Sequence, residues 1–435
     1  MITKKERATM TVKKTNIEEI KTFLNAMGER AVSASRQLVK MSSSEKDECL
    51  EAIAKLIEKN KTSIIEANDI DIDEGIKKGL SSAMIDRLRL DDKRISAMSI
   101  SLRELIKLED PVGKTINTTV RPNGLEIKKV SVPIGVIAII FESRPNVTVD
   151  AAGLCLKSGN AVILRGGSES INSNLALAHC ITRACISKGI DKSIVQLLPW
   201  TDRGAVDAML KMDNYIDLVI PRGGESLIRK VVQESSIPVL KHYKGICNIY
   251  VDNICNEEMV LNIIKNAKCQ RPGVCNAAES LLINEDIAEE ISPKIAKILI
   301  KNGVELRGDT QFCNLVPSAK KATEEDWSTE YLDLIISIKV VPNIQAAIDH
   351  INRYGSKHSD LIITDNNKSA EKFMREVDSS TVYHNASTRF TDGAEFGMGA
   401  EIGISTDKIH ARGPVGLKEL NTYKYLVFGN GQIRE

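Results

Sequence analysis

Residues 134–167 read IGVIAIIFESRPNVTVDAAGLCLKSGNAVILRGG, and the architecture of the chain is clearest in this segment. The runs 135–141 and 161–164 are short, apolar and rich in β-branched residues, which is typical of strands buried on both faces of a sheet. The Ala-rich stretch 149–156 between them predicts a helix. A strand, a helix and a strand in this order predict a crossover unit of a parallel sheet.

The same alternation continues toward the C-terminus. Three further β-branched runs lie at 195–198, 217–220 and 237–240, and the stretch 171–186 predicts a second helix. The pattern predicts a doubly wound parallel sheet of the nucleotide-binding type. The motif Gly-x-Gly-x-x-Gly does not follow the first strand, so the common dinucleotide fingerprint is missing.

Other patterns flank this α/β region. In the first hundred residues, Leu50, Ile53 and Ile57 share one face of a helix that Ser44 is expected to cap. From about residue 253, the pattern predicts a helix at 257–267, another helix around Glu279 and a strand at 334–341. We find no repeat or low-complexity linker, so we expect the domains to be closely knit.

Composition narrows the class of protein. A chain of 435 residues and 47.9 kDa has room for two or three domains, and 42% hydrophobic content excludes disorder. The net charge of +1 argues against a nucleic-acid or anionic membrane partner. The longest apolar run, 132–141, is too short to cross a bilayer, and the N-terminus lacks the apolar segment of a secretory signal. We therefore expect a soluble cytoplasmic protein.

The nine cysteines and six histidines do not suggest a disulfide framework or a metal site. The cysteine count is odd, no Cys-x-x-Cys occurs, and the histidines are scattered. Most of the cysteines are therefore expected to be small buried apolar residues, and no metal is predicted.

One cysteine has a more suggestive context. In the segment QRPGVCNA, residues 270–277, Pro and Gly mark a turn, and a helical pattern follows it, which would place Cys275 near a helix N-terminus. The helix dipole there would favour the thiolate, and the backbone amides would stabilise an oxyanion. The alternative is that Cys275 is one more buried cysteine.

Polar segments follow three of the predicted strands. The segment FESRPN, 141–146, comes after the first strand, at the edge of the sheet where ligands gather in open α/β folds. Arg165-Gly166-Gly167-Ser168 follows the second strand and Arg222-Gly223-Gly224 follows the fourth, and each has the geometry of a backbone nest for phosphate. Each Gly pair has the alternative role of simply turning the chain, and the first segment that of an Asx-type turn.

Near the C-terminus, the Gly-rich segment 390–404 is either an active-site wall or an ordinary loop. Arg389 precedes it. Its guanidinium is suited to bidentate binding of a substrate carboxylate, and a surface ion pair is the alternative.

Taken together, these segments resemble the γ-glutamyl phosphate reductases, a branch of the aldehyde dehydrogenase superfamily. The resemblance runs over nearly the whole chain. It is carried by six segments: 134–167, IPRGGESLI (220–228), QRPGVCNAAESLL (270–282), STEYLDLIISIKVV (328–341), HNASTRFTDGAEFGMGAEIGIST (384–406) and HARGPVGLKELNTYKY (410–425).

The resemblance implies an aldehyde dehydrogenase-like α/β fold. Residues 1–118 and 136–252 would form the cofactor-binding domain and 253–411 the catalytic domain. Residues 119–135 and 412–435 would form a small β flap for oligomerisation, so a homo-oligomer is expected.

The implied reaction is the NADPH-dependent reduction of L-glutamyl 5-phosphate to L-glutamate 5-semialdehyde in proline biosynthesis, with release of phosphate from a cysteine thioester. Cys275 matches the nucleophile and Asn146 the oxyanion-holding amide. Arg165 stands where related dehydrogenases place a lysine that reaches the adenosine ribose, and Glu330 matches the glutamate that holds the nicotinamide ribose. This superfamily binds its dinucleotide without the missing fingerprint.

The chain departs from the superfamily pattern in one place that bears on the chemistry. Hydrolytic members have Glu-Leu-Gly-Gly before the nucleophile, and this chain has Leu-Lys-His-Tyr-Lys-Gly at 240–245, without a carboxylate. A thioester that must survive until hydride arrives fits this lack of a water-activating base. The alternatives are a hydrolytic NAD(P)-dependent aldehyde dehydrogenase and a non-catalytic scaffold or nucleic-acid-binding relative. Asn248 replaces the usual His after Gly245-Ile246-Cys247, and we assign no role there.

The binding partners follow from the same segments. Arg165 with Gly166, Gly167 and Ser168 includes no acidic residue, which favours the 2′-phosphate of NADPH. The second nest, Arg222-Gly223-Gly224, is expected to contribute to cofactor binding. The candidate substrate-binding residues are Arg144, Arg271 and Arg389. No kinase module is present, so the substrate must come from a separate glutamate 5-kinase, with transient contact expected.

Overall fold

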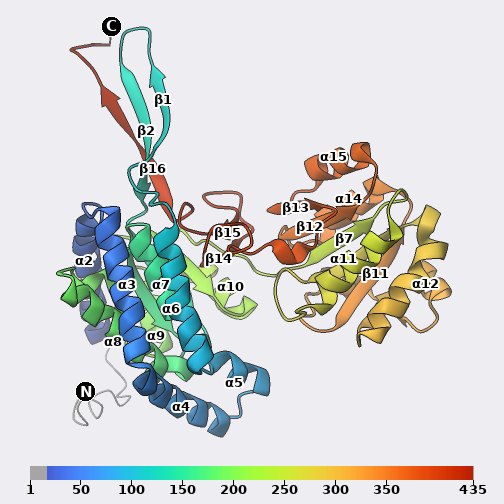
Figure 1. Cartoon of the computed structure of the whole chain (residues 1–435), viewed down its shortest axis with the longest axis horizontal. Coiled ribbons are helices and arrows are strands. Elements are labelled where there is room, and N and C mark those ends of the chain that lie inside the picture. The colour runs from blue at the N-terminus through green and yellow to red at the C-terminus, as the bar shows by residue number, and fades with distance from the viewer. Residues whose placement is uncertain (1–16, 435) are drawn as a thin grey trace. The chain divides into compact units, whose positions relative to one another are not determined.

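The computed structural model describes residues 17–434, which form two compact units (Figure 1). The first unit comprises the chain through Leu240 and the segment from Leu417 onward, and the second is Lys241–Gly416. None of the helices described is both long enough and apolar enough to cross a membrane.

The first unit is built on a four-stranded parallel sheet with the order β5-β4-β3-β6. The strands are β3 (Val136–Phe141), β4 (Ala161–Gly166), β5 (Val195–Leu197) and β6 (Leu218–Arg222). Every residue of β3 and β4 is buried, which explains why their sequences are continuous apolar runs. The predicted crossover unit is confirmed.

The predicted fifth strand at 237–240 is wrong. This run makes only an isolated bridge, in which Val219 donates to the Pro238 carbonyl at 2.9 Å and Leu240 donates to the Val219 carbonyl at 2.9 Å. Pro238 has no N–H group and cannot extend the ladder.

Helices pack on this sheet and form the N-terminal region. They are α2 (Ile17–Leu38), α3 (Ser43–Lys59), α4 (Lys61–Lys77), α5 (Ser82–Leu88), α6 (Asp92–Lys107), α7 (Val147–Lys157), α8 (Ile171–Ser187), α9 (Arg203–Met209) and α10 (Glu225–Glu234), with short 3-10 turns η1 (Ser168–Ser170) and η2 (Lys192–Ile194). The N-cap of α3 is Ser42 rather than Ser44, because Ser42 and Glu45 form a reciprocal capping box.

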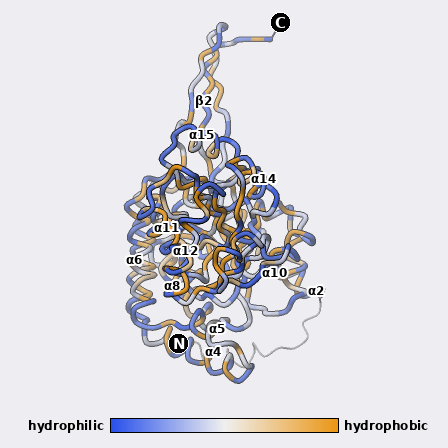
Figure 2. The backbone as a smooth tube through the Cα atoms, turned by 90° about the vertical axis from the view of Figure 1, so that its right-hand side faces the viewer, coloured by the Kyte–Doolittle hydropathy of each residue, from blue (hydrophilic) through white to orange (hydrophobic). Residues whose placement is uncertain are grey.

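A separate antiparallel sheet in the first unit has the order β1-β2-β16 and consists of β1 (Thr115–Val120), β2 (Glu126–Pro133) and β16 (Asn421–Phe428). All of β1 is exposed, and Tyr423, Tyr425 and Val427 of β16 are exposed apolar side chains. Hydrophobic and hydrophilic residues alternate along these strands in Figure 2.

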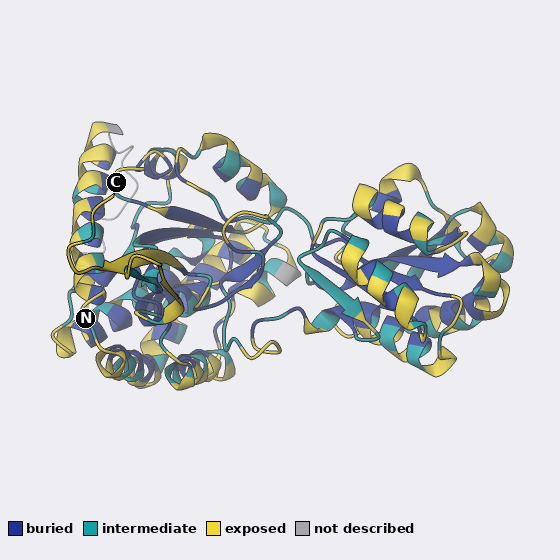
Figure 3. Ribbon diagram, turned by 90° about the horizontal axis from the view of Figure 1, so that it is seen from above, coloured by how far each residue is buried: buried dark blue, intermediate teal, exposed yellow. Residues whose placement is uncertain are grey.

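The second unit contains a seven-stranded sheet, with the order β10-β9-β11-β8-β7-β12-β13, in which every pairing is parallel. Its strands are β7 (Cys247–Val251), β8 (Ala278–Asn284), β9 (Glu305–Gly308), β10 (Lys320–Lys321), β11 (Ile335–Val341), β12 (Ser359–Ile363) and β13 (Thr381–His384). One apolar core lies under α11 and α12, and another lies under α14 and α15. The central strands are buried, and the outer faces of the helices are exposed (Figure 3).

The remaining elements of this unit are α11 (Glu257–Cys269), α12 (Glu285–Lys301), α13 (Thr310–Leu315), η3 (Glu324–Ser328), α14 (Ile344–Tyr354), α15 (Asn367–Glu376), η4 (Thr388–Phe390), and the antiparallel pair β14 (Gly403–Ser405) and β15 (Gly413–Val415). The helix predicted at 257–267 and the strand predicted at 334–341 are confirmed. The helix predicted around Glu279 is wrong, because this segment is the buried strand β8 between β7 and β11. Its place in the centre of the sheet overrides any local helical preference.

Candidate active site

Cys275 lies in a turn between α11 and β8, closed by a hydrogen bond of 3.1 Å from the Ala277 N–H to the Val274 carbonyl. The prediction that it stands at a helix N-terminus is therefore wrong, since a strand follows it. All nine cysteines are free thiols, and Cys275 is one of the four that are partly exposed. Cys275 is thus more exposed than the five buried cysteines.

Gly245 supports the backbone of this turn. A Cβ atom at position 245 would lie 2.6 Å from the Cα of Cys275, so only glycine permits this close approach. The Gly245 N–H donates to Oε1 of Glu330 at 2.9 Å. The structure therefore brings Glu330 and Cys275 to the same glycine.

Asn276 anchors the other side of the turn. Its side-chain amide donates to the Thr391 carbonyl at 2.9 Å and to the Arg389 carbonyl at 3.3 Å. Its own carbonyl accepts from the Thr388 hydroxyl at 2.7 Å. These bonds attach the turn of residues 274–277, called the cysteine turn below, to η4, which carries Arg389. Asn276 and Thr388 were not predicted as functional residues, because nothing in the local sequence indicates their contact.

Two arginines accompany Cys275. Arg389 donates from Nε to the Gln270 side chain at 2.8 Å. Burial lowers the pKa of Arg389, repulsion from Arg271 lowers it further, and attraction to Cys275 opposes both effects. Arg271 is exposed. The two guanidinium groups give the surroundings of the cysteine turn a local positive charge.

The segment where hydrolytic relatives have a glutamate carries Lys241, which forms an ion pair of 3.1 Å with Asp407. In the Gly-rich segment, Glu401 accepts the Gly393 N–H at 2.9 Å, so this carboxylate holds its own loop together.

Asn146 belongs to the first unit, where it is the N-cap residue of α7. Its side-chain amide does not cap the helix and donates to Asp150 at 2.9 Å. Desolvation raises the pKa of Asp150 to about 6, and the bond from Asn146 opposes this rise.

Arg165 is the next-to-last residue of β4 and is only 9% exposed. It donates from Nη2 to the Thr201 carbonyl at 3.0 Å, and its buried Nε has no hydrogen-bond partner within residues 17–434. Burial lowers its pKa, while Glu169 and Glu142 raise it. A buried guanidinium with an unused donor fits a phosphate-bearing ligand.

Carboxylates of the chain itself lie against both Arg-Gly-Gly turns. The Cδ atom of Glu169 lies 2.5 Å from the position that a Cβ of Gly167 would take. The carboxylate of Glu169 also accepts hydrogen bonds from the N–H and hydroxyl groups of Ser143, at 2.6 and 2.8 Å. Glu142 accepts the Gly224 N–H, at the start of α10, at 3.0 Å. Neither carboxylate was predicted. The Gly224 amide thus already binds an anionic group in this structure, as expected of a phosphate nest.

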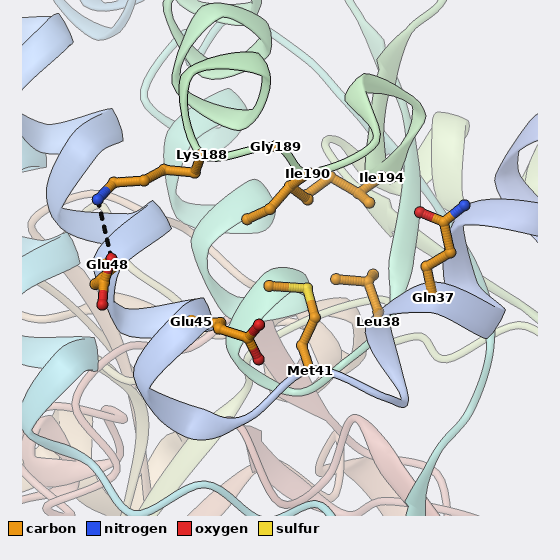
Figure 4. Close-up of a pocket in the computed structure, with 9 residues that line it drawn as sticks. All are labelled: Gln37, Leu38, Met41, Glu45, Glu48, Lys188, Gly189, Ile190 and Ile194. Carbon is orange, nitrogen blue, oxygen red and sulfur yellow. Dashed lines mark hydrogen bonds and ion pairs between the residues drawn. The ribbon is translucent and has the colours of Figure 1, made fainter.

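A cavity of about 170 Å³ opens elsewhere in the first unit (Figure 4). Lys188 and Glu48 form an ion pair of 3.0 Å at its edge. Its lining is Gln37, Leu38, Met41, Glu45, Glu48, Lys188, Gly189, Ile190 and Ile194. None of the predicted site residues lines it, so it lies outside the candidate site.

Comparisons with known proteins define the class. Residues 4–333 match the model of the "Aldehyde dehydrogenase family". The γ-glutamyl phosphate reductase of Halothermothrix orenii is 52% identical over 96% of this chain and 100% of that protein, and that of Clostridium beijerinckii is 53% identical over 94% and 98%. The chain therefore belongs to the aldehyde dehydrogenase family, in the branch of the γ-glutamyl phosphate reductases.

Comparisons with solved structures support the same family and fold. The chain is similar to the γ-glutamyl phosphate reductase of Thermotoga maritima, with 48% identity, a TM-score of 0.93 and coverage of 95% of this chain and 100% of that one. It shares its fold with an acetylating aldehyde dehydrogenase from Geobacillus thermoglucosidasius, with 16% identity, a TM-score of 0.68 and coverage of 96% and 99%. The predicted aldehyde dehydrogenase-like α/β fold is confirmed.

Proposed function

We propose that this enzyme reduces L-glutamyl 5-phosphate to L-glutamate 5-semialdehyde with NADPH and releases phosphate, as a step of proline biosynthesis. The observation that carries the proposal is the identity of about half of all positions with γ-glutamyl phosphate reductases over their full length. The partly exposed Cys275, braced by Gly245 and Asn276, supports the covalent route.

The reaction begins when the Cys275 thiolate attacks the acyl carbonyl, and the amide of Asn146 holds the resulting oxyanion together with the Cys275 N–H. The oxyanion collapses, the carbon–oxygen bond to phosphate breaks, and a thioester remains on the sulfur. When NADPH is bound, it would supply the hydride for reduction of this thioester. Cys275 then leaves as a thiolate and the aldehyde is released.

The first unit binds the phosphates of the cofactor in this proposal. Arg165, with Gly166, Gly167 and Ser168, receives the 2′-phosphate, and its buried, unpartnered Nε supports that role. Arg222, Gly223 and Gly224 receive the cofactor's other phosphates, supported by the Gly224 amide that binds a carboxylate here. Glu330 holds the nicotinamide ribose. A higher catalytic efficiency with NADH than with NADPH would contradict the assignment of Arg165.

The substrate carries a phosphate and an α-carboxylate, and we assign Arg144, Arg271 and Arg389 to these anionic groups. The exposed tyrosines of β16 support a role for the β1-β2-β16 sheet as an oligomerisation flap. Delivery of the short-lived acyl phosphate by transient contact with glutamate 5-kinase, in the cytoplasm, completes the proposal.

A phosphate-dependent reverse assay tests the reaction type. With L-glutamate 5-semialdehyde and NADP⁺, the proposed enzyme reduces the nucleotide only when inorganic phosphate is added, because phosphate must cleave the thioester. A hydrolytic dehydrogenase needs no phosphate. The Lys241–Asp407 ion pair, where hydrolytic relatives have the water-activating glutamate, favours the phosphate-dependent result. Equal rates with and without phosphate would replace the proposal with hydrolysis.

A further inference from the structure

A second cysteine, Cys247, lies directly behind the candidate nucleophile. It is the first residue of β7 and has no exposed surface. Its Sγ is 3.2 Å from the backbone carbonyl oxygen of Cys275. The adjacent strands β7 and β8 pair Cys247 with Ala278, which brings this thiol under the cysteine turn although 28 residues separate the two cysteines.

The direction of this hydrogen bond is determined by chemistry. A carbonyl oxygen only accepts, so the Cys247 thiol must donate and must keep its proton. Burial raises the pKa of Cys247 well above its ordinary value, and the nearby Asp360 carboxylate raises it further. The other polar neighbour is Nδ1 of His358, at 3.7 Å. Burial lowers the pKa of this histidine to about 4, so at neutral pH it does not draw the proton away by forming a thiolate–imidazolium pair.

The hydrogen bond from Cys247 holds the peptide group between Cys275 and Asn276, and other contacts already restrict the rotation of this group. Gly245 touches the Cα of Cys275, Asn276 is tied to Thr388 and Thr391, and the Cys247 S–H fixes the carbonyl between them. Rotation of this peptide plane would move the Cβ and the sulfur of Cys275. A nucleophile displaced by about 1 Å from its attack geometry loses on the order of 100-fold in rate.

We propose that Cys247 is a positioning residue, whose thiol donates to the Cys275 carbonyl and holds the nucleophilic sulfur in its attack geometry. The inference rests on the proposed role of Cys275 as nucleophile, but not on the identity of the acyl substrate. It gives a role to the Gly-Ile-Cys segment, for which the sequence indicated none.

The test compares three variants. Cys247→Ala removes the donor, Cys247→Ser retains a donor, and Cys155→Ala is a matched control because Cys155 is equally buried but lies in α7 of the first unit. We expect kcat of Cys247→Ala to fall by about tenfold or more with KM within twofold of the parent value. We expect Cys247→Ser to recover most of the rate and Cys155→Ala to keep it.

A second measurement uses no substrate. The rate of iodoacetamide modification of Cys275, followed by mass spectrometry of its peptide, should fall in Cys247→Ala and recover in Cys247→Ser. If the parent enzyme fails to reduce L-glutamyl 5-phosphate but shows this pattern, the proposed function is wrong and the positioning role stands. Parent-like kcat and modification rate in Cys247→Ala, or equal losses in Cys247→Ala and Cys155→Ala, would overturn the inference.

Discussion

The strand-end turns of the first unit and the cysteine turn of the second unit are both loops beside a parallel sheet, but they are held in different ways. The Arg-Gly-Gly turns present backbone amides and a buried guanidinium, and the carboxylates of Glu142 and Glu169 lie on them. The cysteine turn is fixed by its own Asn276, which donates to the Thr391 carbonyl, and by side chains that reach it from other elements, such as Thr388 and Cys247. The comparison shows that a backbone amide of the first unit binds a carboxylate of the chain, whereas several side-chain hydrogen bonds fix the cysteine turn of the second unit.

The largest effect on activity is expected when the proposed nucleophile, Cys275, is removed. Cys275→Ala should lower turnover by at least about 10³-fold, because no other group forms the thioester. NADPH binding, measured by fluorescence titration, should be retained, since the proposed phosphate-binding turns belong to the first unit. Cys269→Ala, at the partly exposed end of α11, is the control and should stay active. Turnover near the parent value in Cys275→Ala would refute the covalent route.

The rigidity of the second unit can be tested at a buried ion pair. Lys268 of α11 and Glu279 of β8 are 2.6 Å apart and both side chains are fully buried. Lys268→Met leaves a buried carboxylate without its partner and should lower the free energy of unfolding by about 3–5 kcal/mol. Urea unfolding measures this.

An exposed pair provides the control for that experiment. Lys294 pairs with Glu257 at 2.7 Å, but both side chains are exposed. Lys294→Met should leave the free energy of unfolding close to the parent value, because solvent screens an exposed ion pair. Equal effects of the two substitutions would mean that the buried pair does not brace the sheet.

A pH effect on stability is expected from a buried histidine of the second unit. Burial lowers the pKa of His350 to about 4, below the unfolded value of about 6.5. The unfolded chain therefore takes up a proton between these values, and stability is lost as the pH falls from 6.5 toward 4. At pH 5 the low pKa of this buried histidine reduces the free energy of unfolding by about 2 kcal/mol. His350→Phe should reduce the difference in unfolding free energy between pH 7 and pH 5 by that amount.

The control for the pH experiment is His384→Gln, since His384 is exposed. This variant shows how far a substitution at an exposed histidine alters the measured difference. An unchanged pH dependence in His350→Phe would show that the ring of His350 is protonated as readily in the folded chain as in the unfolded one.

The smallest effect is expected at the Arg222-Gly223-Gly224 turn of the first unit. Glu142→Gln removes a negative charge from the Gly224 amide, so a cofactor phosphate meets less competition and NADPH should bind about two- to fivefold more tightly. Glu225→Gln is the control, because Glu225 pairs with Arg229. Weaker NADPH binding in Glu142→Gln, by calorimetry, would mean that Glu142 assists the cofactor rather than competing with it.

Some features of the fold and of the candidate site can be predicted from short stretches of the sequence. Strands β3 and β4 and helix α7 were predicted because a strand buried on both faces must be apolar throughout. Cys275 and the two Arg-Gly-Gly turns were singled out from turn chemistry and resemblance. The two wrong secondary-structure predictions have different causes. The segment 278–284 became a strand through its neighbours β7 and β11, and the missing N–H of Pro238 outweighed the β-branched pattern of 237–240.

The sequence alone thus determined the alternation of strands and helices, the family, and the cysteine expected to do the chemistry, because these depend on local composition and on motifs in order along the chain. Only the tertiary structure decided that Cys247 lies under Cys275, that Gly245 touches both that turn and Glu330, and that Glu142 and Glu169 fold back onto the two Arg-Gly-Gly turns. Such contacts depend on how strands pair and how loops return, and that pairing is not encoded in any short stretch of residues.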